Sequence, residues 1–451
     1  MAESQTVLQP AALGAATAKL EAHDIEYARR YPGDSPHRQP VHTVYGGAQL
    51  FKSDAAPKLA QIAQRMREQY APDAGVFTGA LGVDVDYAPL VHQRVCERLA
   101  DQGVEDFRID FEDGYGNRRD AEEDGHAAAA AREVATGMRD GVLPPFIGIR
   151  IKPMTPELRG RAVRTLDIFM TTLLRQTGGA LPSNFVVTLP KLTSPAHADY
   201  FASVLDAMET ALGLTRDSLR FEFMVETPQI LIGPDGRCPL PLVLEAARGR
   251  AVAAHFGTYD YTASCNITAA EQRMRHPVCD HARHIMQVAL AGTGVWLSDG
   301  STAVLPVPPH RAAEGSSLSA VQMQENRDVV HRAWKLHYDD VQDSLMRGYY
   351  QGWDLHPAQL VTRYAALFDF FLRGLQPAGD RLHNFLGKAA QATLLGDMFD
   401  DAATGQGLLN FFLRAINAGA VTEDETMKRT GLTLDELQTR SFVQILKGRT
   451  A

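Results

Sequence analysis

Three carboxylates follow a short apolar stretch in the segment FRIDFEDGYG, residues 107–116. Asp110, Glu112 and Asp113 stand where this stretch, which reads as a buried strand, gives way to a glycine-containing turn. Like charges this close repel one another, and a buried carboxylate is costly unless a positive group compensates it. Either the loop faces water and its acids are solvated, or a cation binds there.

Charged residues also stand at the ends of the other apolar stretches. A single polar residue in such a position is ordinarily solvated or caps the following helix. A whole set favours one acidic site with oxygen ligands and a basic residue beside it. Carboxylates without a cysteine or histidine partner suit Mg²⁺ or Mn²⁺ better than Zn²⁺. In chain order after the three acids, the set is Arg150, Lys191, Glu226, Asp260, Asp299 and His356.

Eight short apolar stretches alternate with long amphipathic segments. The stretches lie near 42–46, 106–111, 146–151, 184–190, 220–225, 252–257, 294–298 and 352–356. Helices are expected between them at 89–101, 119–138, 157–176, 195–213, 278–292 and 318–349. Eight such units predict an α/β fold, the (β/α)8 TIM barrel, whose functional groups gather at the carboxyl ends of the strands.

The pattern changes after about residue 358, where the chain is predicted to be helical to its end. Glycine or proline should break these helices at three places, 376–380, 404–407 and 430–433. The predicted organisation has three parts, an N-terminal segment at 1–40, a barrel at 41–374 and a helical C-terminal extension at 375–451.

The composition is that of a globular enzyme. The 451 residues carry a formal net charge of −9 and are 45% hydrophobic, with no basic footprint for nucleic acid. No stretch approaches the roughly 20 apolar residues that span a membrane. The 4 cysteines are far apart and form no CxxC pattern, which indicates reduced thiols, and the acidic N-terminus is unlike a signal peptide. We therefore expect a cytoplasmic protein.

Six motifs in chain order carry a resemblance to a known family. They are FRIDFEDG, IGIRIK, TLPKLTS, MVETPQ, HFGTYDYTA and WDLHPAQL. Together they resemble the citrate lyase β-subunit and malyl-CoA lyase branch of the HpcH/HpaI aldolase superfamily, over roughly residues 40–360. The resemblance implies a TIM barrel with a Mg²⁺-dependent site that makes or breaks carbon–carbon bonds in 2-oxo or hydroxy acids.

The resemblance also implies roles for individual residues. Glu226 in ETP and Asp260 in GTYDYT match the metal-ligand carboxylates of the family. Arg150 matches the catalytic arginine that holds a substrate carboxylate, a role that suits its planar fork. Glu112 and Asp113 match a catalytic acidic pair beside the metal, where they would hold metal-bound waters.

Lys191 and several departures from the family pattern leave alternatives open. Lys191 either supports substrate binding electrostatically or is a surface lysine beside a helix. Gln229 stands where the family often has arginine, VYGGAQLF replaces the usual first-strand motif, and GPDGRCPLP is inserted between the two metal-ligand candidates. The use of a coenzyme A thioester stays open, because no basic site for its phosphates is evident.

Three functions fit these residues. The leading interpretation is a metal-dependent lyase or aldolase, and the alternatives are a non-thioester pyruvate aldolase and a non-catalytic metabolite-binding barrel. A homo-oligomer is expected. The extension either closes over the strand ends of its own or a neighbouring barrel, or it only builds the oligomer interface. As a lid it would supply an acid–base aspartate from among Asp380, Asp397, Asp400 and Asp401.

Overall fold

Eight parallel strands close into one barrel. This computed structural model describes residues 13–35, 37–387, 393–395, 398–400, 402–441, 444–445 and 448–449. The strands pair in chain order, and β1 pairs with β8 to close the barrel. This confirms the predicted (β/α)8 TIM barrel and all eight predicted strands. Their bounds are β1 (His42–Gly47), β2 (Asp106–Asp110), β3 (Phe146–Arg150), β4 (Phe185–Leu189), β5 (Arg220–Val225), β6 (Ala251–Phe256), β7 (Trp296–Ser301) and β8 (Gln351–Asp354).

The strand sequences suit burial on both faces. In β3 (FIGIR) and β4 (FVVTL) every residue is buried, and most are β-branched or aromatic. Gly148 in β3 is required by close packing, because a Cβ there would lie 2.0 Å from the carbonyl oxygen of Val186. β4 ends at Leu189 because Pro190 cannot donate to the strand ladder.

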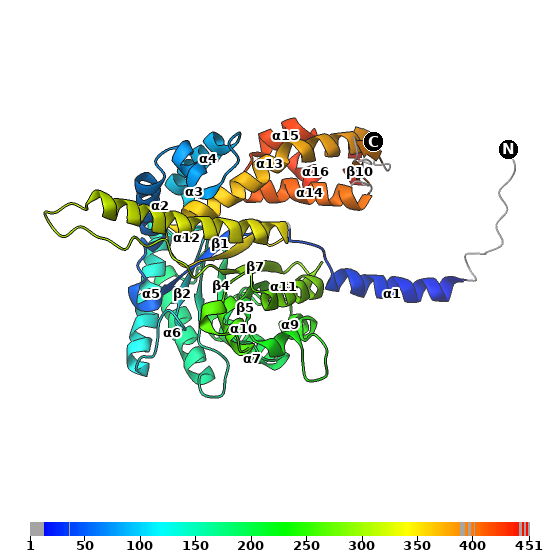
Figure 1. Ribbon diagram of the computed structural model, residues 1–451. Coiled ribbons are helices and arrows are strands. Elements are labelled where there is room, and N and C mark those ends of the chain that lie inside the picture. Colours follow the sequence, from blue (N-terminus) through cyan, green and yellow to red (C-terminus); the bar gives the residue numbers. More distant parts are fainter. Residues whose placement is uncertain are drawn as a thin grey trace.

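Helices surround the barrel (Figure 1). Six of them confirm the predicted helices, whereas α2, α3, α8, α9 and α10 were not predicted. α1 (Gly14–Arg30) has no buried residue and extends away from the barrel. None of the helices in the described part of the chain is long and apolar enough to cross a membrane. The helices around the barrel are α2 (Ala55–Tyr70), α3 (Ala74–Leu81), α4 (Ala88–Gln102), α5 (Asp120–Asp140), α6 (Arg159–Thr177), α7 (Pro195–Leu212), α8 (Pro228–Leu231), α9 (Leu240–Ala246), α10 (Thr258–Ser264), α11 (Pro277–Leu290) and α12 (Ala320–Met346), with 3-10 turns η2 (Ala48–Leu50) and η3 (Ala269–Glu271).

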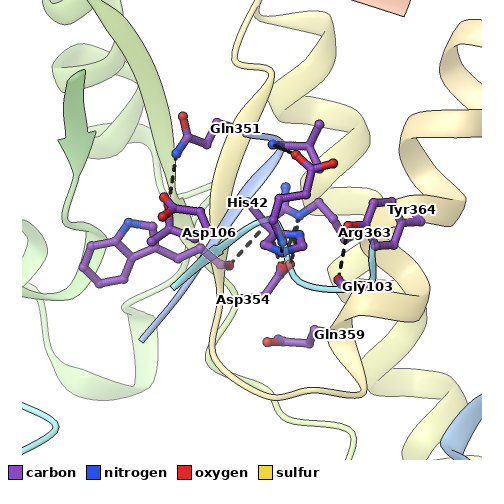
Figure 2. A network of polar contacts seen from close by, with 12 residues as sticks. His42, Gly103, Asp106, Gln351, Asp354, Gln359, Arg363 and Tyr364 are labelled. Carbon is purple, nitrogen blue, oxygen red and sulfur yellow. Dashed lines mark hydrogen bonds and ion pairs between the residues drawn. The ribbon is translucent and has the colours of Figure 1, made fainter. Parts of the chain in front are cut away.

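A buried polar network joins the closing seam of the barrel to the following helix (Figure 2). Asp354, at the end of β8, pairs with Arg363 at 2.9 Å and lies 3.1 Å from Nε2 of His337. Nδ1 of His42, in β1, is 3.5 Å from the same carboxylate. Because the backbone N–H of Glu105 donates to Nε2 of His42, the ring proton lies on Nδ1 and faces Asp354. Burial lowers the pKa of His42 to about 4, so the ring stays neutral and the arginine supplies the compensating charge.

The C-terminal extension begins inside a helix. α13 (Gln359–Gly387) runs through the predicted boundary at 374–375 and contains Pro377, so the predicted break at 376–380 is wrong. Proline removes one backbone donor from a helix. The helix persists because Ala378 and Leu382, just beyond the proline, are buried in a second apolar core that α13 shares with α14 (Ala402–Asn417).

The rest of the extension departs from the prediction in two further ways. The break at 404–407 is wrong, because α14 runs through it. β9 (Thr393–Leu395) and β10 (Met398–Asp400) form an antiparallel pair where only helix was expected. The third break is confirmed, since α15 (Glu423–Thr430) ends at Gly431 and α16 (Leu434–Gln438) follows.

The extension packs against the end of the barrel where the strands begin. Asn417 of α14 accepts from the backbone N–H of Gln39 at 2.9 Å and donates to its carbonyl oxygen at 2.7 Å. Arg94 of α4 pairs with Glu425 of α15 at 2.5 Å. Gln39 also donates to the carbonyl oxygen of Leu297, near the start of β7. The described extension therefore lies opposite the carboxyl ends of the strands, and the prediction that it closes over its own barrel is wrong for these residues.

Of the four aspartates considered for a lid, two lie outside the described residues, namely Asp397 and Asp401. Asp380 is exposed and accepts from Gln376 at 2.7 Å, and Asp400 lies in β10. Closure over a neighbouring barrel, assembly of an oligomer and the division into three parts stay predictions.

Candidate functional site

The carboxyl ends of four strands bring their charged residues together around Lys191. Its Nζ lies 2.5 Å from Oε1 of Glu112, 3.3 Å from Oδ2 of Asp113 and 3.4 Å from Oδ2 of Asp260. Its backbone N–H donates to Oε1 of Glu226 at 2.7 Å. One lysine therefore contacts four acids that the sequence places after β2, β5 and β6, and it belongs to this cluster rather than to an ordinary surface.

The backbone at Lys191 allows this double contact. Its φ of 50° lies in the left-handed region, which few residues other than glycine adopt. Directly after Pro190, this turn directs both the N–H and the side chain toward the acids. Burial opposes the charge of the ammonium group, but Glu226 and Glu112 outweigh it and raise the pKa of Lys191. The lysine is therefore a fixed cation within the cluster.

Glu226 and Asp260 approach each other across the ends of β5 and β6. Glu226 is 1% exposed, whereas the side chain of Asp260 is 42% exposed. Burial, together with the charge of Asp260, raises the pKa of Glu226 to about 8. Gly257 lets α10 begin here, because a Cβ at that position would lie 2.3 Å from Oε2 of Glu226. A cation shared by the two carboxylates would relieve both the burial and the repulsion.

The pKa values of Glu112 and Asp113 are shifted in opposite directions by their surroundings in the cluster. Burial raises the pKa of Glu112 to about 7. The pKa of Asp113 is lowered, because its hydrogen bond to Glu112 and the charges of Arg150 and Lys191 outweigh its burial. A carboxyl group whose pKa lies near neutrality can give or take a proton at neutral pH.

Arg150, at the end of β3, presents one side of its guanidinium group to these acids. Its Nε and Nη2 donate to Oδ1 and Oδ2 of Asp110 at 2.7 and 2.6 Å. Its Nη1 lies 3.3 Å from Oε2 of Glu112 and 3.6 Å from Oδ2 of Asp113. Asp110 therefore holds the arginine in place, and Nη1 is the part that faces the cluster.

Sequence reasoning missed the two aromatic residues that hold Arg150. The guanidinium carbon lies 4.7 Å from the ring centre of Tyr45 in β1 and 5.7 Å from that of Trp353 in β8. Such contacts attract a cation to the ring face. The only sequence signal for these contacts was the presence of an aromatic residue in both the first and the last strand, because these two strands become neighbours when the barrel closes. The Tyr45 hydroxyl is buried and has no hydrogen-bond partner among the described residues.

Two predicted strand-end residues do not join the cluster. Asp299 of β7 turns outward and accepts from Arg283 at 2.9 Å and from Ser344 at 2.6 Å. His356 accepts from the backbone N–H of Ala358 at 3.2 Å and so caps the start of α13. A separate group of three acids with ligand atoms within 4.8 Å of one another surrounds the cation of Arg250; its members are Asp206, Glu209 and Asp217.

Comparisons with known proteins agree with the fold. A family model described as "Domain of unknown function (DUF6986)" matches residues 20–445, and no curated protein matches the chain. A citrate lyase structure from Burkholderia xenovorans is 18% identical with a TM-score of 0.54, covering 87% of this chain and 97% of that one. A malate synthase from Haloferax volcanii is 15% identical with a TM-score of 0.46, covering 90% and 99%. Protein CitE from Mycobacterium tuberculosis, in complex with magnesium, acetoacetate and coenzyme A, is 14% identical with a TM-score of 0.43, covering 88% and 100%. At 18% identity, the likeness to the Burkholderia xenovorans structure concerns the fold alone.

Proposed function

The chain belongs to the family described as domain of unknown function DUF6986, and we propose that it is a metal-dependent carbon–carbon lyase or aldolase of the citrate lyase β-like type. Its substrate would be a 2-oxo or hydroxy acid. The observation that carries the proposal is the convergence of four carboxylates from three strand ends on Lys191, with Arg150 beside them. The fold shared with a citrate lyase supports it.

The donor set fits Mg²⁺ or Mn²⁺. These hard cations prefer oxygen ligands, and Glu226 and Asp260 would provide them. Because the Lys191 N–H already holds Oε1 of Glu226, the orientation of this carboxylate is fixed before any ion binds. Glu112 and Asp113 would hold water molecules of the ion. A divalent cation bound there would polarise the carbonyl and carboxylate oxygens of the substrate.

The balance of charge explains why an acidic site would accept an anionic substrate. Four carboxylates surround one lysine, and Asp110 already neutralises Arg150. The site is therefore net negative, and it needs a further cation before an anionic substrate can bind. Nη1 of Arg150 would bind the substrate carboxylate.

A thermal-shift experiment tests the proposal. We expect pyruvate, oxaloacetate or glyoxylate to raise the Tm only when Mg²⁺ is present, because the acid and the ion share the site. A ligand at 100 times its Kd stabilises the native state by about 2.7 kcal/mol. The control is the same titration without Mg²⁺, with the acids added as potassium salts at matched ionic strength. Stabilisation that does not depend on Mg²⁺, or none with any acid, would contradict the proposal.

Turnover assays on the acids that bind then separate the three functions. Cleavage or formation of a carbon–carbon bond with free acids alone would favour the pyruvate aldolase. A requirement for a coenzyme A thioester would favour the lyase branch. Binding of acid and metal without any bond cleavage or formation would leave a metabolite-binding barrel.

Arg150→Lys should weaken keto-acid binding by about 1.5–3 kcal/mol, the usual contribution of a hydrogen bond to a charged group. Lysine keeps the charge but cannot hold Asp110 with two nitrogens while presenting a third. The measurement is a keto-acid titration at saturating Mg²⁺. Arg164→Lys is the control, because Arg164 is an exposed arginine paired with Asp124 outside the site. Wild-type affinity in Arg150→Lys would place the carboxylate anchor elsewhere.

A further inference from the structure

A basic pocket lies at the opposite end of the barrel from the acid cluster. Its volume is about 370 Å³, and residues of the N-terminal segment, α4, α14 and α16 line it. No acidic residue lines it within the described part of the chain. The basic residues that line it are His37, Arg38, Arg98, Arg414 and Arg440.

Arg414 is a half-buried cation with little compensating negative charge. Its side chain is 20% exposed, and the paired carboxylate of Asp34 is 3.9 Å away. That carboxylate is closer to Arg440, at 2.9 Å. Arg414 also donates to Oε1 of Gln39 and lies over the ring of Tyr350, but these contacts bring no negative charge. Burial, opposed only in part by Asp34, lowers the pKa of Arg414. A charge in this position is stabilised by an anion.

A second pair of guanidinium groups lines the same pocket. Arg38 and Arg98 share the carboxylate of Glu105, which Arg38 contacts at 2.9 Å. Glu105 is buried and also accepts from the backbone N–H of Val41 at 3.0 Å. Nε of Arg98 is buried without a hydrogen-bond partner among the described residues. Around the pocket, four guanidinium groups therefore share two carboxylates.

The backbone at Arg440 also favours a role for its side chain. Its φ of 50° is left-handed, at a helix end where glycine is the usual residue. α15 is followed by a glycine in this conformation, Gly431, with a φ of 69°. The guanidinium of Arg440 donates to the carbonyl oxygen of Ser35 at 3.2 Å and so stays at the pocket wall. Glycine would adopt this conformation without strain, so the presence of an arginine here indicates a role for its side chain.

We propose that this pocket binds a small organic anion, a phosphate ester or a polycarboxylate, which clamps the C-terminal helices onto the N-terminal segment. Guanidinium groups pair in two-point fashion with the oxygens of phosphate and carboxylate alike. Three apolar lining residues, Leu413, Ile416 and Leu434, offer a surface to the carbon skeleton. The volume falls within the range of small-molecule sites. Because the walls come from four separate segments, a bound anion links the extension to the barrel.

Calorimetric titration of the full chain tests this, with inorganic phosphate and citrate as separate probes and no added divalent metal. We expect saturable binding and a rise in Tm that chloride at the same ionic strength does not produce. Tighter binding of phosphate would indicate a phosphate ester, and tighter binding of citrate a polycarboxylate. Hydrogen exchange over residues 402–440 should slow when the probe binds. Failure of both probes to bind the wild-type protein would overturn the proposal and leave the proposed catalytic function intact.

Two variants locate the binding. Arg414→Gln should weaken binding of either probe at least tenfold, and Arg38→Gln, at a side chain that is 38% exposed, provides the same test with less risk to folding. Arg248→Gln should bind as wild type, because this exposed arginine pairs with Asp199 and Asp206 elsewhere on the surface.

Arg150→Lys excludes the alternative that a probe binds among the strand ends. Binding at the basic pocket should persist unchanged in this variant. If Arg150→Lys abolished binding while Arg414→Gln and Arg38→Gln retained it, the probe would occupy the strand-end site and the proposal would be wrong.

Discussion

Glu226→Gln should abolish Mg²⁺ binding and lower turnover by several orders of magnitude while the barrel stays folded. The amide has nearly the same shape but lacks the charge that a hard cation requires. Even groups that only orient a ligand contribute about 10–100-fold to metal affinity, so loss of a ligand should exceed that. Without metal, the variant should be at least as stable as the wild type, because burial of Glu226 and its repulsion from Asp260 disfavour the carboxylate.

Calorimetric titration with Mg²⁺ measures this effect, and Asp260→Asn should reproduce it. Asp299→Asn is the matched control, because it also removes a strand-end charge but from a residue that faces Arg283 outside the cluster. We expect that control to lose stability and to keep its Mg²⁺ affinity. Unchanged Mg²⁺ affinity in Glu226→Gln would refute the assignment of the ligands.

Arg108→Met should destabilise the protein by about 3–5 kcal/mol, the cost of leaving a buried charge without its partner. Arg108 lies inside the barrel, where its Nε and Nη2 each donate to Glu222 at 2.8 Å. It also pairs with Asp106. Removal of the arginine would leave both carboxylates buried. The remaining partners of Glu222 would be His255, at 2.9 Å, and the hydroxyl of Thr188. Denaturant unfolding gives the difference in free energy.

The sign of the pH dependence provides a second readout for Arg108→Met. Uncompensated buried carboxylates have a raised pKa in the folded state, so the native variant would bind more protons than its unfolded chain. Its stability should therefore recover as the pH falls from 8 toward about 5. Arg164→Met, which removes an arginine with a 62% exposed side chain, should cost at most about 1 kcal/mol. Equal losses in the two variants would show that the interior network contributes little.

The parts of the fold that the sequence predicts are those with a local signature. Strands buried on both faces appear as apolar runs, so the eight strands and the charged residues after them could be located. The contacts of Arg150 could not, because Asp110, Tyr45 and Trp353 come from three other strands, and no short segment reveals which side chains of those strands reach the arginine. Pro377 and the glycines of α14 suggested breaks that tertiary packing overrides. The end of the barrel to which the extension binds depends on individual contacts such as that between Asn417 and Gln39. Such contacts leave no recognisable pattern in the sequence.

The closing seam of the barrel has a consequence for biosynthesis. The hydrogen bond from Gln351 to Thr43 joins residues 308 positions apart in the chain. At translation rates of about 5–20 residues per second, the ribosome needs roughly 15–60 s to make that length. During this time β1 has no β8 to pair with, and an unpaired strand edge invites pairing with other chains. Trp353 is made at the end of the same interval. A nascent chain therefore contains all four clustered acids before Arg150 can contact Trp353. A chaperone that shields β1 should therefore raise the yield of active protein more than one that acts after release.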